Sequence, residues 1–323
     1  MTRATRPRAT ASLALLAAVT LLLAACGSGG VYPATQVPST TTTPPAGAAT
    51  PASNVCTPDA LTSYAPLPTL DVGAVPPAVR DRKLLRVGVS ADSELLAARN
   101  PLTNQIEGFD IDIARAVAKA IFGDANKIQL VVISSADRIP KLKNKSVDMV
   151  ARNMSMTCSR WNDMAFSAEY YQSGLKILVP DNPEGRKITT FAQLKGKKVC
   201  APTGTSTIDF IETQGVIPVG AATHTGCLVL FQQGKIDAIA GDDTVLAGLV
   251  AQDPYAYVPK IAALTSEPYG LGFNKADVSL VQFTNTLLDQ MKADGRWTAI
   301  YDKWFASPLG PAPAPPVSKY GRP

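Results

Sequence analysis

The sequence of 323 residues predicts an α/β protein of two lobes, each a mixed β-sheet flanked by helices. Three observations carry this prediction. Short apolar runs typical of strands alternate with amphipathic stretches that favour helices over residues 84–151, and a second alternation of the same kind begins at residue 191. Residues 267–273 are predicted to return the chain to the first lobe, so that two crossings form a hinge.

The first alternation supplies the elements of one lobe. Strands are predicted at residues 84–89, 128–133 and 147–151, with a helix from Asp110 to Gly123 and a short helix at 138–142. The third strand places residues 155–160 after its carboxyl end. Open α/β sheets bind ligands at that edge, so we expect these residues to face a ligand.

The second alternation supplies the other lobe. Strands are predicted at 198–201 and 236–240, with helices at 205–214, 227–232 and 244–252, and two later helices at 278–293 and 297–305 belong again to the first lobe. The predicted boundaries are therefore 81–175 plus 270–307 for the first lobe and 176–269 for the second.

The start of the chain reads as a signal for export. Residues 1–25 contain three arginines followed by an apolar run that is too short to span a bilayer comfortably. They end in Leu-Ala-Ala before Cys26, which resembles the lipobox of bacterial lipoproteins, where the cysteine is acylated. The alternative is an ordinary signal peptide with a chance cysteine. Acylation would anchor the protein to the outer face of the cell membrane.

The segments on either side of the predicted lobes have a different composition. Residues 26–80 are rich in Gly, Thr, Ala and Pro without apolar periodicity, and predict a disordered linker behind the lipidated end. Residues 308–323 are predicted to form a Pro-rich tail of similar character. Removing the leader with its three arginines lowers the formal charge from +5 to about +2, which leaves no basic stripe for nucleic acid.

Several short motifs follow one another in a fixed order. They are Gly108-Phe109-Asp110-Ile111-Asp112, Arg138, Ser155-Met156-Thr157-Cys158-Ser159-Arg160, Thr203-Gly204-Thr205-Ser206 and Asp242-Asp243-Thr244. Together they provide two fixed cations, a run of hydroxyl donors and a carboxylate pair. This set matches a free amino acid, which carries a carboxylate, an ammonium group and a side chain.

On these motifs, residues 81–307 resemble family 3 of the bacterial solute-binding proteins, the polar-amino-acid group, and are most similar to actinobacterial glutamine/glutamate-binding lipoproteins. The resemblance implies a type II periplasmic-binding-protein fold that closes on its ligand at a hinge. It also implies that a membrane-anchored monomer delivers an amino acid to an ABC transporter permease, without a metal or cofactor. A sensor that reports to a membrane signalling partner is an alternative, as is a dehydratase-like enzyme of the same fold.

The resemblance assigns roles to the first-lobe residues. Arg160 is expected to hold the ligand α-carboxylate through a forked pair of hydrogen bonds, with Ser155 and Thr157 beside it. The alternative is a surface arginine that pairs with Asp163. Arg138, in a stretch that lines the side-chain pocket in dicarboxylate binders, is expected to meet a second carboxylate. There the alternative is a solvated arginine on a helix.

Further ligand contacts are expected from both lobes. Thr205 and Ser206 would grip the carboxylate at a helix start, or would serve only as helix caps. Asp242 is favoured over Asp243 for the ammonium group, since Asp243 can cap the next helix. The remaining candidates are Ser135 beside Arg138, the lone histidine His224, and Arg99. Glu94 lies where relatives often have an aromatic residue, and would repel an anionic ligand if it pointed inward.

Four cysteines remain after Cys26, which allows three pairings in an oxidising compartment. A bridge between the lobes would lock the hinge. We therefore expect Cys200 to pair with Cys227 within the second lobe, and Cys56 to pair with Cys158. A zinc site is not expected, because the chain has no Cys-x-x-Cys motif and only one histidine.

Overall fold

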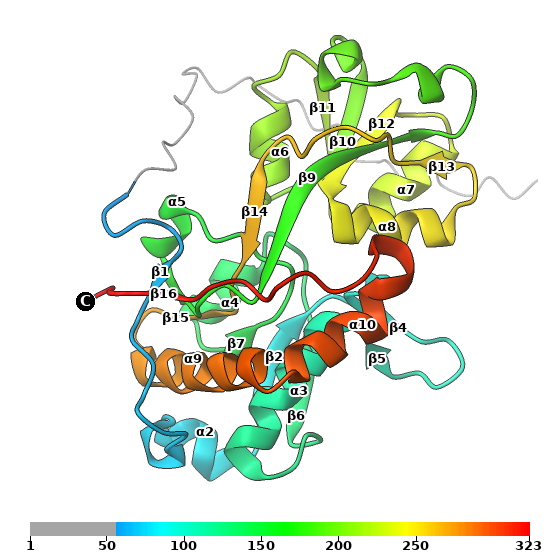
Figure 1. The fold of residues 1–323 in the computed structure, drawn as a ribbon. Coiled ribbons are helices and arrows are strands. Elements are labelled where there is room, and N and C mark those ends of the chain that lie inside the picture. Colours follow the sequence, from blue (N-terminus) through cyan, green and yellow to red (C-terminus); the bar gives the residue numbers. More distant parts are fainter. Residues whose placement is uncertain (1–55) are drawn as a thin grey trace, which may run out of the picture. The chain divides into compact units, whose positions relative to one another are not determined.

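The computed structural model describes residues 56–323. The predicted signal peptide, Cys26 and the first part of the predicted linker lie outside the described residues. The described part contains two large mixed sheets, one in each lobe (Figure 1). Over residues 56–323, none of the helices combines the length and the hydropathy that a bilayer span requires.

The first lobe is built on a five-stranded sheet with the order β6-β2-β7-β15-β8. Its strands are β2 (Leu85–Val89), β6 (Ile128–Val132), β7 (Met149–Val150), β8 (Met164–Phe166) and β15 (Gly272–Asn274), and its helices include α3 (Phe109–Phe122), α4 (Arg138–Lys143), α5 (Cys158–Trp161), α9 (Val278–Ala293) and α10 (Arg296–Leu309). The strands β2, β6 and β7 are parallel, so their carboxyl ends meet at one edge. The residues that follow those ends, up to α4 and α5, include Arg138 and Arg160.

Helix α3 shows how the sequence pattern produces this lobe. Its residues Phe109, Ile113 and Val117 are fully buried, because they recur at helical spacing on the side that faces the core. The helix ends at Gly123, whose φ of 74° is left-handed and suits glycine. The predicted end of this helix is thus present in the structure.

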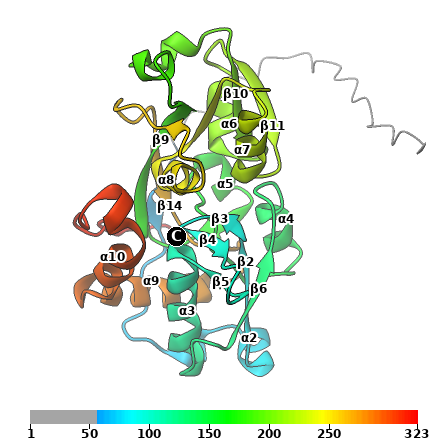
Figure 2. The ribbon, with the colours of Figure 1, turned by 90° about the vertical axis from the view of Figure 1, so that its right-hand side faces the viewer.

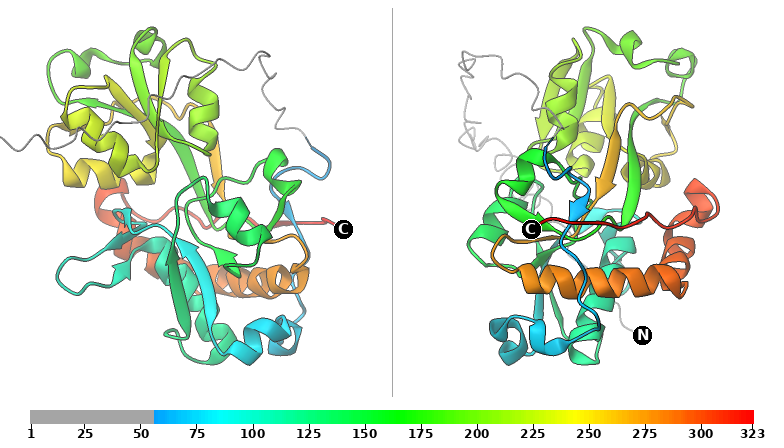
Figure 3. Two further views of the ribbon diagram at one scale, coloured as in Figure 1. Left: turned by 180° about the vertical axis from the view of Figure 1, so that it is seen from behind. Right: turned by 60° about the vertical axis from the view of Figure 1, so that its left-hand side comes forward.

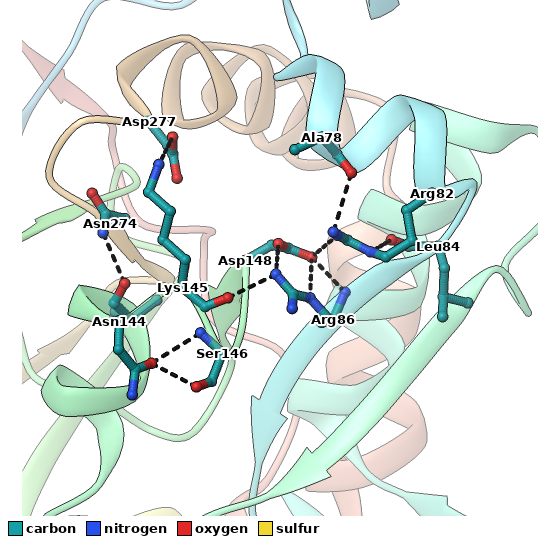
Figure 4. A network of polar contacts seen from close by, with 11 residues as sticks. Ala78, Arg82, Leu84, Arg86, Asn144, Lys145, Ser146, Asp148, Asn274 and Asp277 are labelled. Carbon is teal, nitrogen blue, oxygen red and sulfur yellow. Dashed lines mark hydrogen bonds and ion pairs between the residues drawn. The ribbon is translucent and has the colours of Figure 1, made fainter.

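A network of charges closes the opposite, amino-terminal end of this sheet (Figure 4). The carboxylate of Asp148 forms ion pairs with Arg82 and Arg86, and its Oδ2 also accepts from the Arg86 backbone N–H at 2.8 Å. Arg86 lies in β2 and Asp148 precedes β7, so the network fixes the register of these two strands. It does so at the end of the sheet opposite to their carboxyl ends.

The second lobe is built on a six-stranded sheet, in which β11-β10-β12-β9-β13 form one path and β14 also pairs with β9. Its strands are β9 (Tyr171–Pro180), β10 (Lys198–Pro202), β11 (Ile217–Ala221), β12 (Ala238–Asp242), β13 (Ala256–Tyr257) and β14 (Ser266–Tyr269), and its helices are α6 (Ser206–Ile211), α7 (His224–Gln232) and α8 (Asp243–Gln252). The central strands carry residues such as Val199 and Ile239 that are fully buried, since helices cover the sheet.

Two adjacent crossings connect the lobes. The chain leaves the first sheet after β8 to enter the long strand β9, and returns from β14 into β15 (Figure 1). Backbone hydrogen bonds link the crossings, from Ser167 N–H to Leu271 O and from Tyr170 N–H to Tyr269 O, both at 2.9 Å. A pair of neighbouring extended segments is the arrangement on which two lobes can bend.

The structure differs from the sequence prediction at both ends of the described chain. Within the predicted linker, residues 56–80 include β1 (Thr62–Ser63), η1 (Val72–Ala74) and the start of α2 (Pro77–Arg82). Within the predicted tail, α10 continues to Leu309, and β16 (Lys319–Tyr320) pairs in parallel with β1. The Pro-rich composition gave no sign of this packing. The residues that pair are distant in the sequence, so no local pattern indicates them.

Two disulfides are present, with the predicted pairings. Cys56 is bonded to Cys158, and Cys200 is bonded to Cys227. The second bond joins β10 to α7 within one lobe, while the first joins the start of the described chain to α5. Neither bond connects the two large sheets, so both leave the crossings free to bend.

A small three-stranded sheet was not predicted. It has the order β3-β4-β5, with β3 (Asp92–Ser93), β4 (Ala97–Arg99) and β5 (Ile106–Glu107). The edge of this sheet reaches the second lobe, where the Thr225 hydroxyl on α7 donates to Asp92 O at 2.8 Å. The strands are too short to leave a periodic apolar signal in the sequence.

Candidate functional site

A small cavity lies between the lobes. It is lined from the first lobe by Arg138, Asn153, Ser155 and Arg160, and from the second by Thr205, Ser206, Thr207, His224 and Asp242. Figure 2 shows α4 and α5 of one lobe below α6 and α7 of the other. Seven of the eleven residues expected from the sequence to contact a ligand therefore line one shared cavity.

Arg160 reaches the cavity from α5, the short helix that Thr157 caps by accepting from the Arg160 backbone N–H. The side chain is buried, and its Nη1 donates to Ser155 O at 2.6 Å. Burial lowers the pKa of Arg160, which the charges of Glu267, Asp209 and Asp242 oppose. The alternative pairing with Asp163 is absent, because Asp163 pairs with Lys143 at 2.8 Å.

Arg138 reaches the same cavity from α4 and is only 2% exposed, so it is not a solvated helix arginine. Its guanidinium donates to carbonyl oxygens of Ser135, Arg152 and Asn153 in the first lobe, and to Gly204 O in the second lobe at 2.9 Å. Burial lowers the pKa of Arg138, with further contributions from Arg160 and Arg152. This side chain thus joins the lobes across the cavity.

The two guanidinium groups converge. Nη2 of Arg160 lies 3.5 Å from the same Gly204 oxygen that accepts from Arg138. Among residues 56–323, the ion pairs within 4.0 Å do not include Arg138, Arg152 or Arg160. A buried guanidinium without a carboxylate partner is costly, so this part of the cavity is suited to an anion.

Asp242 supplies the opposite charge from the end of β12. Its Oδ2 accepts from the Tyr269 hydroxyl at 2.6 Å. Burial, followed by the charge of Glu267, raises the pKa of Asp242 to about 7. A cationic group in the cavity would lower that pKa by pairing with the carboxylate.

Asp243 is directed away from the cavity, since its Oδ1 accepts from the Ser173 hydroxyl at 2.6 Å and from the Thr244 backbone N–H at 2.7 Å. Asp242, which the sequence analysis favoured over Asp243, is thus the aspartate that lines the cavity.

The second-lobe hydroxyls have defined partners. Thr205 caps α6, because its Oγ1 accepts from Ile208 N–H at 3.2 Å while donating to Pro202 O at 2.7 Å. Ser206 donates to Glu267 Oε2 at 2.9 Å and lies 3.3 Å from the Ser155 hydroxyl across the cavity. Thr205 therefore has the capping role that the sequence left open, and Ser206 lies where the lobes meet.

His224 begins α7, and its Nε2 lies 3.2 Å from Ala240 O. Burial and the charge of Arg152 lower the pKa of His224 to about 4. The ring is therefore neutral near pH 7, and contributes a hydrogen-bonding group to the cavity rather than a charge.

The remaining expected contacts lie elsewhere. Ser135 accepts from Arg152 Nη1 at 2.5 Å, so it holds a neighbouring arginine in place. Thr157 lies at the cap of α5. Arg99 donates to Asn104 O at 2.8 Å and, with Glu94, lines a separate surface pocket beside Trp304. Glu94 thus does not face the cavity, and the predicted repulsion of an anionic ligand by its side chain does not arise.

Four residues at or beside the cavity were missed by sequence reasoning, namely Asn153, Thr207, Glu267 and Tyr269. Asn153 lines it in a left-handed conformation with φ of 34°, and its backbone N–H donates to Asp110 Oδ2 at 2.9 Å. Glu267 and Tyr269 both lie in β14. Glu267 accepts from the Ser206 hydroxyl, and Tyr269 donates to Asp242. The Gly-Phe-Asp motif pointed to Asp110 but not to its partner, and β14 was identified only as a crossing.

Two lobes on a two-segment hinge, with opposed charges around one cavity, define a binding protein that encloses a small polar ligand. The chain belongs to the bacterial extracellular solute-binding proteins, family 3, whose family model matches residues 85–307.

Relatives and solved structures agree with this assignment. The chain is 33% identical over 231 residues to the ABC transporter glutamine-binding protein GlnH of Bacillus subtilis, covering 71% of this chain and 83% of that protein. It is 27% identical to the glutamate-binding protein GluB of Corynebacterium efficiens, over 65% of this chain and 74% of that protein. A mutant of the arginine-binding protein ArgBP from T. maritima is similar in structure, with a TM-score of 0.66, 28% identity, and coverage of 71% and 98%.

Proposed function

We propose that the protein binds an amino acid with an acidic side chain, aspartate or glutamate, ahead of the amides asparagine and glutamine. One observation carries the proposal: the lining of a single cavity contains two buried arginines and one aspartate. With the aspartate ionised and His224 neutral, the lining bears one net positive charge. An acidic amino acid bears one net negative charge and so complements it.

Each charge of such a ligand has a counterpart. Arg160 would take the α-carboxylate, because only two of its donors have recorded contacts and the guanidinium can fork onto two oxygens. Asp242 would take the ammonium group. Arg138 would take the second carboxylate by exchanging one of its four carbonyl partners. Three charge-assisted contacts of ~1.5–3 kcal/mol each reach the scale of a micromolar Kd, about −8 kcal/mol.

The relatives support an amino acid as the ligand but differ in which one their names state. They include glutamine-, glutamate- and arginine-binding proteins. An arginine ligand would place a third cation beside Arg138 and Arg160, which the charge of this cavity disfavours. The charge of the lining, more than the names of the relatives, therefore selects the acidic amino acids.

Relatives named as ABC transporter binding proteins support delivery of the ligand to such a transporter. Acylation at Cys26 would hold the protein at the outer face of the membrane, where a permease is within reach of the tether. A membrane sensor would instead bind the same ligand-bound protein with its lobes closed. Recovery of a permease or of a sensor with the crosslinked full-length protein distinguishes these two partners.

Neither of the two general-acid candidates that the sequence offered for a dehydratase suits that role. A dehydratase would need a general acid, for which the sequence provided Glu94 and His224. Glu94 lines the separate surface pocket, and the lowered pKa of His224, about 4, makes it a poor proton donor at neutral pH.

The test is calorimetric titration of the purified protein with the twenty amino acids. We expect aspartate and glutamate to bind with the lowest Kd, followed by asparagine and glutamine. Tighter binding of arginine or of an apolar amino acid would contradict the charge argument, and the absence of binding to all twenty would remove the proposed function.

A further inference from the structure

The helix that carries Arg160 is too short to be stable alone. Helix α5 contains only Cys158–Trp161. A single turn costs more conformational entropy than its few hydrogen bonds return, so its geometry depends on tertiary contacts. The position of the Arg160 guanidinium therefore depends on the tertiary contacts made at the two ends of this turn.

The amino-terminal part of the described chain holds α5 at both ends. The disulfide between Cys56 and Cys158 fixes the first residue of the helix. The last residue, Trp161, donates from its indole Nε1 to Ala60 O at 2.8 Å, and its ring lies edge-on to that of Tyr64 at 6.1 Å between centroids. Residues 56–64 thus bracket the turn.

The carboxyl-terminal tail completes the enclosure. The guanidinium of Arg322 lies 3.6 Å from the centroid of the Trp161 ring, which is buried. Arg322 also donates from Nε to Thr62 O at 2.8 Å and from Nη2 to Asp59 O at 3.0 Å. The tail therefore binds the indole and the amino-terminal segment together.

The tail itself is well anchored. Its strand β16 pairs with β1, and Figure 3 shows the two segments side by side next to the carboxyl terminus. Asp289 on α9 accepts from the hydroxyl groups of Ser318 at 2.6 Å and Tyr320 at 2.7 Å. These contacts bring Arg322 to Trp161 without involving the second lobe.

We propose that the two ends of the folded chain form a clasp on α5 that positions Arg160 for ligand binding, with Trp161 and Arg322 as positioning residues. The clasp consists of Cys56, Ala60, Cys158, Trp161 and Arg322. The proposal rests on the proposed function in one respect, namely that Arg160 contacts the ligand. Because the clasp packs against the first lobe and does not contact the second, it orders the binding arginine without resisting closure of the lobes.

The test compares three tail variants by calorimetry with glutamate, by thermal unfolding, and by hydrogen exchange of residues 157–162. Arg322→Ala should weaken the affinity about three- to tenfold and speed exchange in that segment, because the cation no longer stacks on the buried indole. Arg322→Lys should recover part of both effects, since it keeps the charge but not the planar stack.

Lys319→Ala is the matched control in the same tail. Lys319 has only a long, exposed ion pair, 3.9 Å from Asp59. Such pairs contribute little, so affinity should remain within about twofold of the wild type. A loss of affinity in Arg322→Ala that exceeds that of Lys319→Ala, with faster exchange at residues 157–162, supports the clasp.

Two results would overturn it. Unchanged affinity in Arg322→Ala, whether or not the melting temperature falls, would show that the tail stabilises the fold without positioning Arg160. An equal loss in Lys319→Ala would show a nonspecific effect of the tail. If the wild type bound no amino acid, the proposed function would fail separately, and unchanged exchange at residues 157–162 in Arg322→Ala would then overturn the clasp by itself.

Discussion

Two groups of arginines lie at opposite ends of the first-lobe sheet and differ in their partners. At the amino-terminal end, Arg82 and Arg86 form ion pairs with Asp148 (Figure 4). At the carboxyl-terminal end, Arg138 and Arg160 donate to carbonyl oxygens, and the ion pairs recorded for residues 56–323 include neither.

The two groups differ in whether a carboxylate of the protein already compensates the arginine charge. Arg82 and Arg86 are 28% and 26% exposed and already compensated by a carboxylate. Arg138 and Arg160 are more deeply buried, and carbonyl dipoles offset only part of the cost of burying their charge. A ligand carboxylate would complete that compensation. Burial of these charges therefore lowers the stability of the ligand-free protein and strengthens binding of an anion.

The largest expected effect comes from Arg160→Ala. Removing it strands the ligand carboxylate in a buried site, which costs ~2–5 kcal/mol and raises the Kd for glutamate by about thirtyfold or more. Calorimetry measures the change.

Arg86→Ala is the matched control from the other end of the sheet. It should lower the melting temperature because Asp148 loses a partner, and leave the Kd within about twofold. Equal losses of affinity in both variants would contradict the different roles assigned to Arg160 and Arg86.

Arg138→Ala tests selectivity, with the next largest effect. If Arg138 meets a second carboxylate, the variant should lose about tenfold or more of its affinity for glutamate, and less for glutamine, because a charge-assisted hydrogen bond contributes ~1.5–3 kcal/mol. Titration of both ligands into both proteins gives the ratio. An equal loss for the two ligands would mean that Arg138 acts only through its bond to Gly204 across the lobes.

Acidification should weaken binding through Asp242. This carboxyl group has a pKa raised to about 7 by burial, and it must be ionised to hold an ammonium group. The affinity should therefore fall about tenfold between pH 8 and pH 6, as protonation removes the acceptor.

A pH series of titrations checks this, with Glu169→Gln as the control. Burial raises the pKa of Glu169 to about 7 as well, but Glu169 does not line the cavity. Its removal should leave the pH profile of the affinity unchanged, and a flattened profile would contradict the assignment to Asp242.

The contribution of Asp242 to the stability of the ligand-free protein should change in the opposite direction over this range. A carboxyl group whose pKa rises from 3.8 to about 7 on folding binds protons more tightly in the folded state. Its contribution to the free energy of unfolding therefore grows as the pH falls from about 7 towards 4. Thermal unfolding without ligand shows whether the two trends diverge.

The smallest effect is expected from Gly248→Ala, which tests closure. A Cβ at Gly248 on α8 would lie 2.5 Å from Glu94 O in the first lobe, so the lobes could not approach as closely. The affinity should fall about fivefold, on the scale of ~1 kcal/mol for a local steric conflict. Gly226→Ala on α7 is the control, because its Cβ would meet only ordinary contacts of 3.5 Å or more.

The predictable parts of the molecule are those with a local signal. The alternation of strands and helices predicted both large sheets, and glycine at position 123 predicted the end of α3. Residue chemistry and spacing also gathered Arg138, Arg160 and Asp242 in one cavity. Arg138 and Arg160 lie on short helices that follow strand ends, and Asp242 ends β12, so their placement depends on strand ends that the sequence pattern indicates.

The parts that could not be predicted depend on contacts between distant segments. Nothing near Arg322 in the sequence indicates Trp161, and composition alone made the tail look unpacked. Arg99 was misplaced because the β3-β5 sheet, which carries it away from the cavity, is too short to show periodicity. Glu267 was missed because a crossing strand was not expected to reach Ser206.

The most direct test of the account is a crystal structure of the protein with glutamate bound. We predict the ligand α-carboxylate on the guanidinium of Arg160 and the ammonium group on Asp242, with both lobes in contact with the ligand. A ligand bound outside this cavity, or one that leaves Arg160 bonded only to the Ser155 and Gly204 carbonyls, would contradict it.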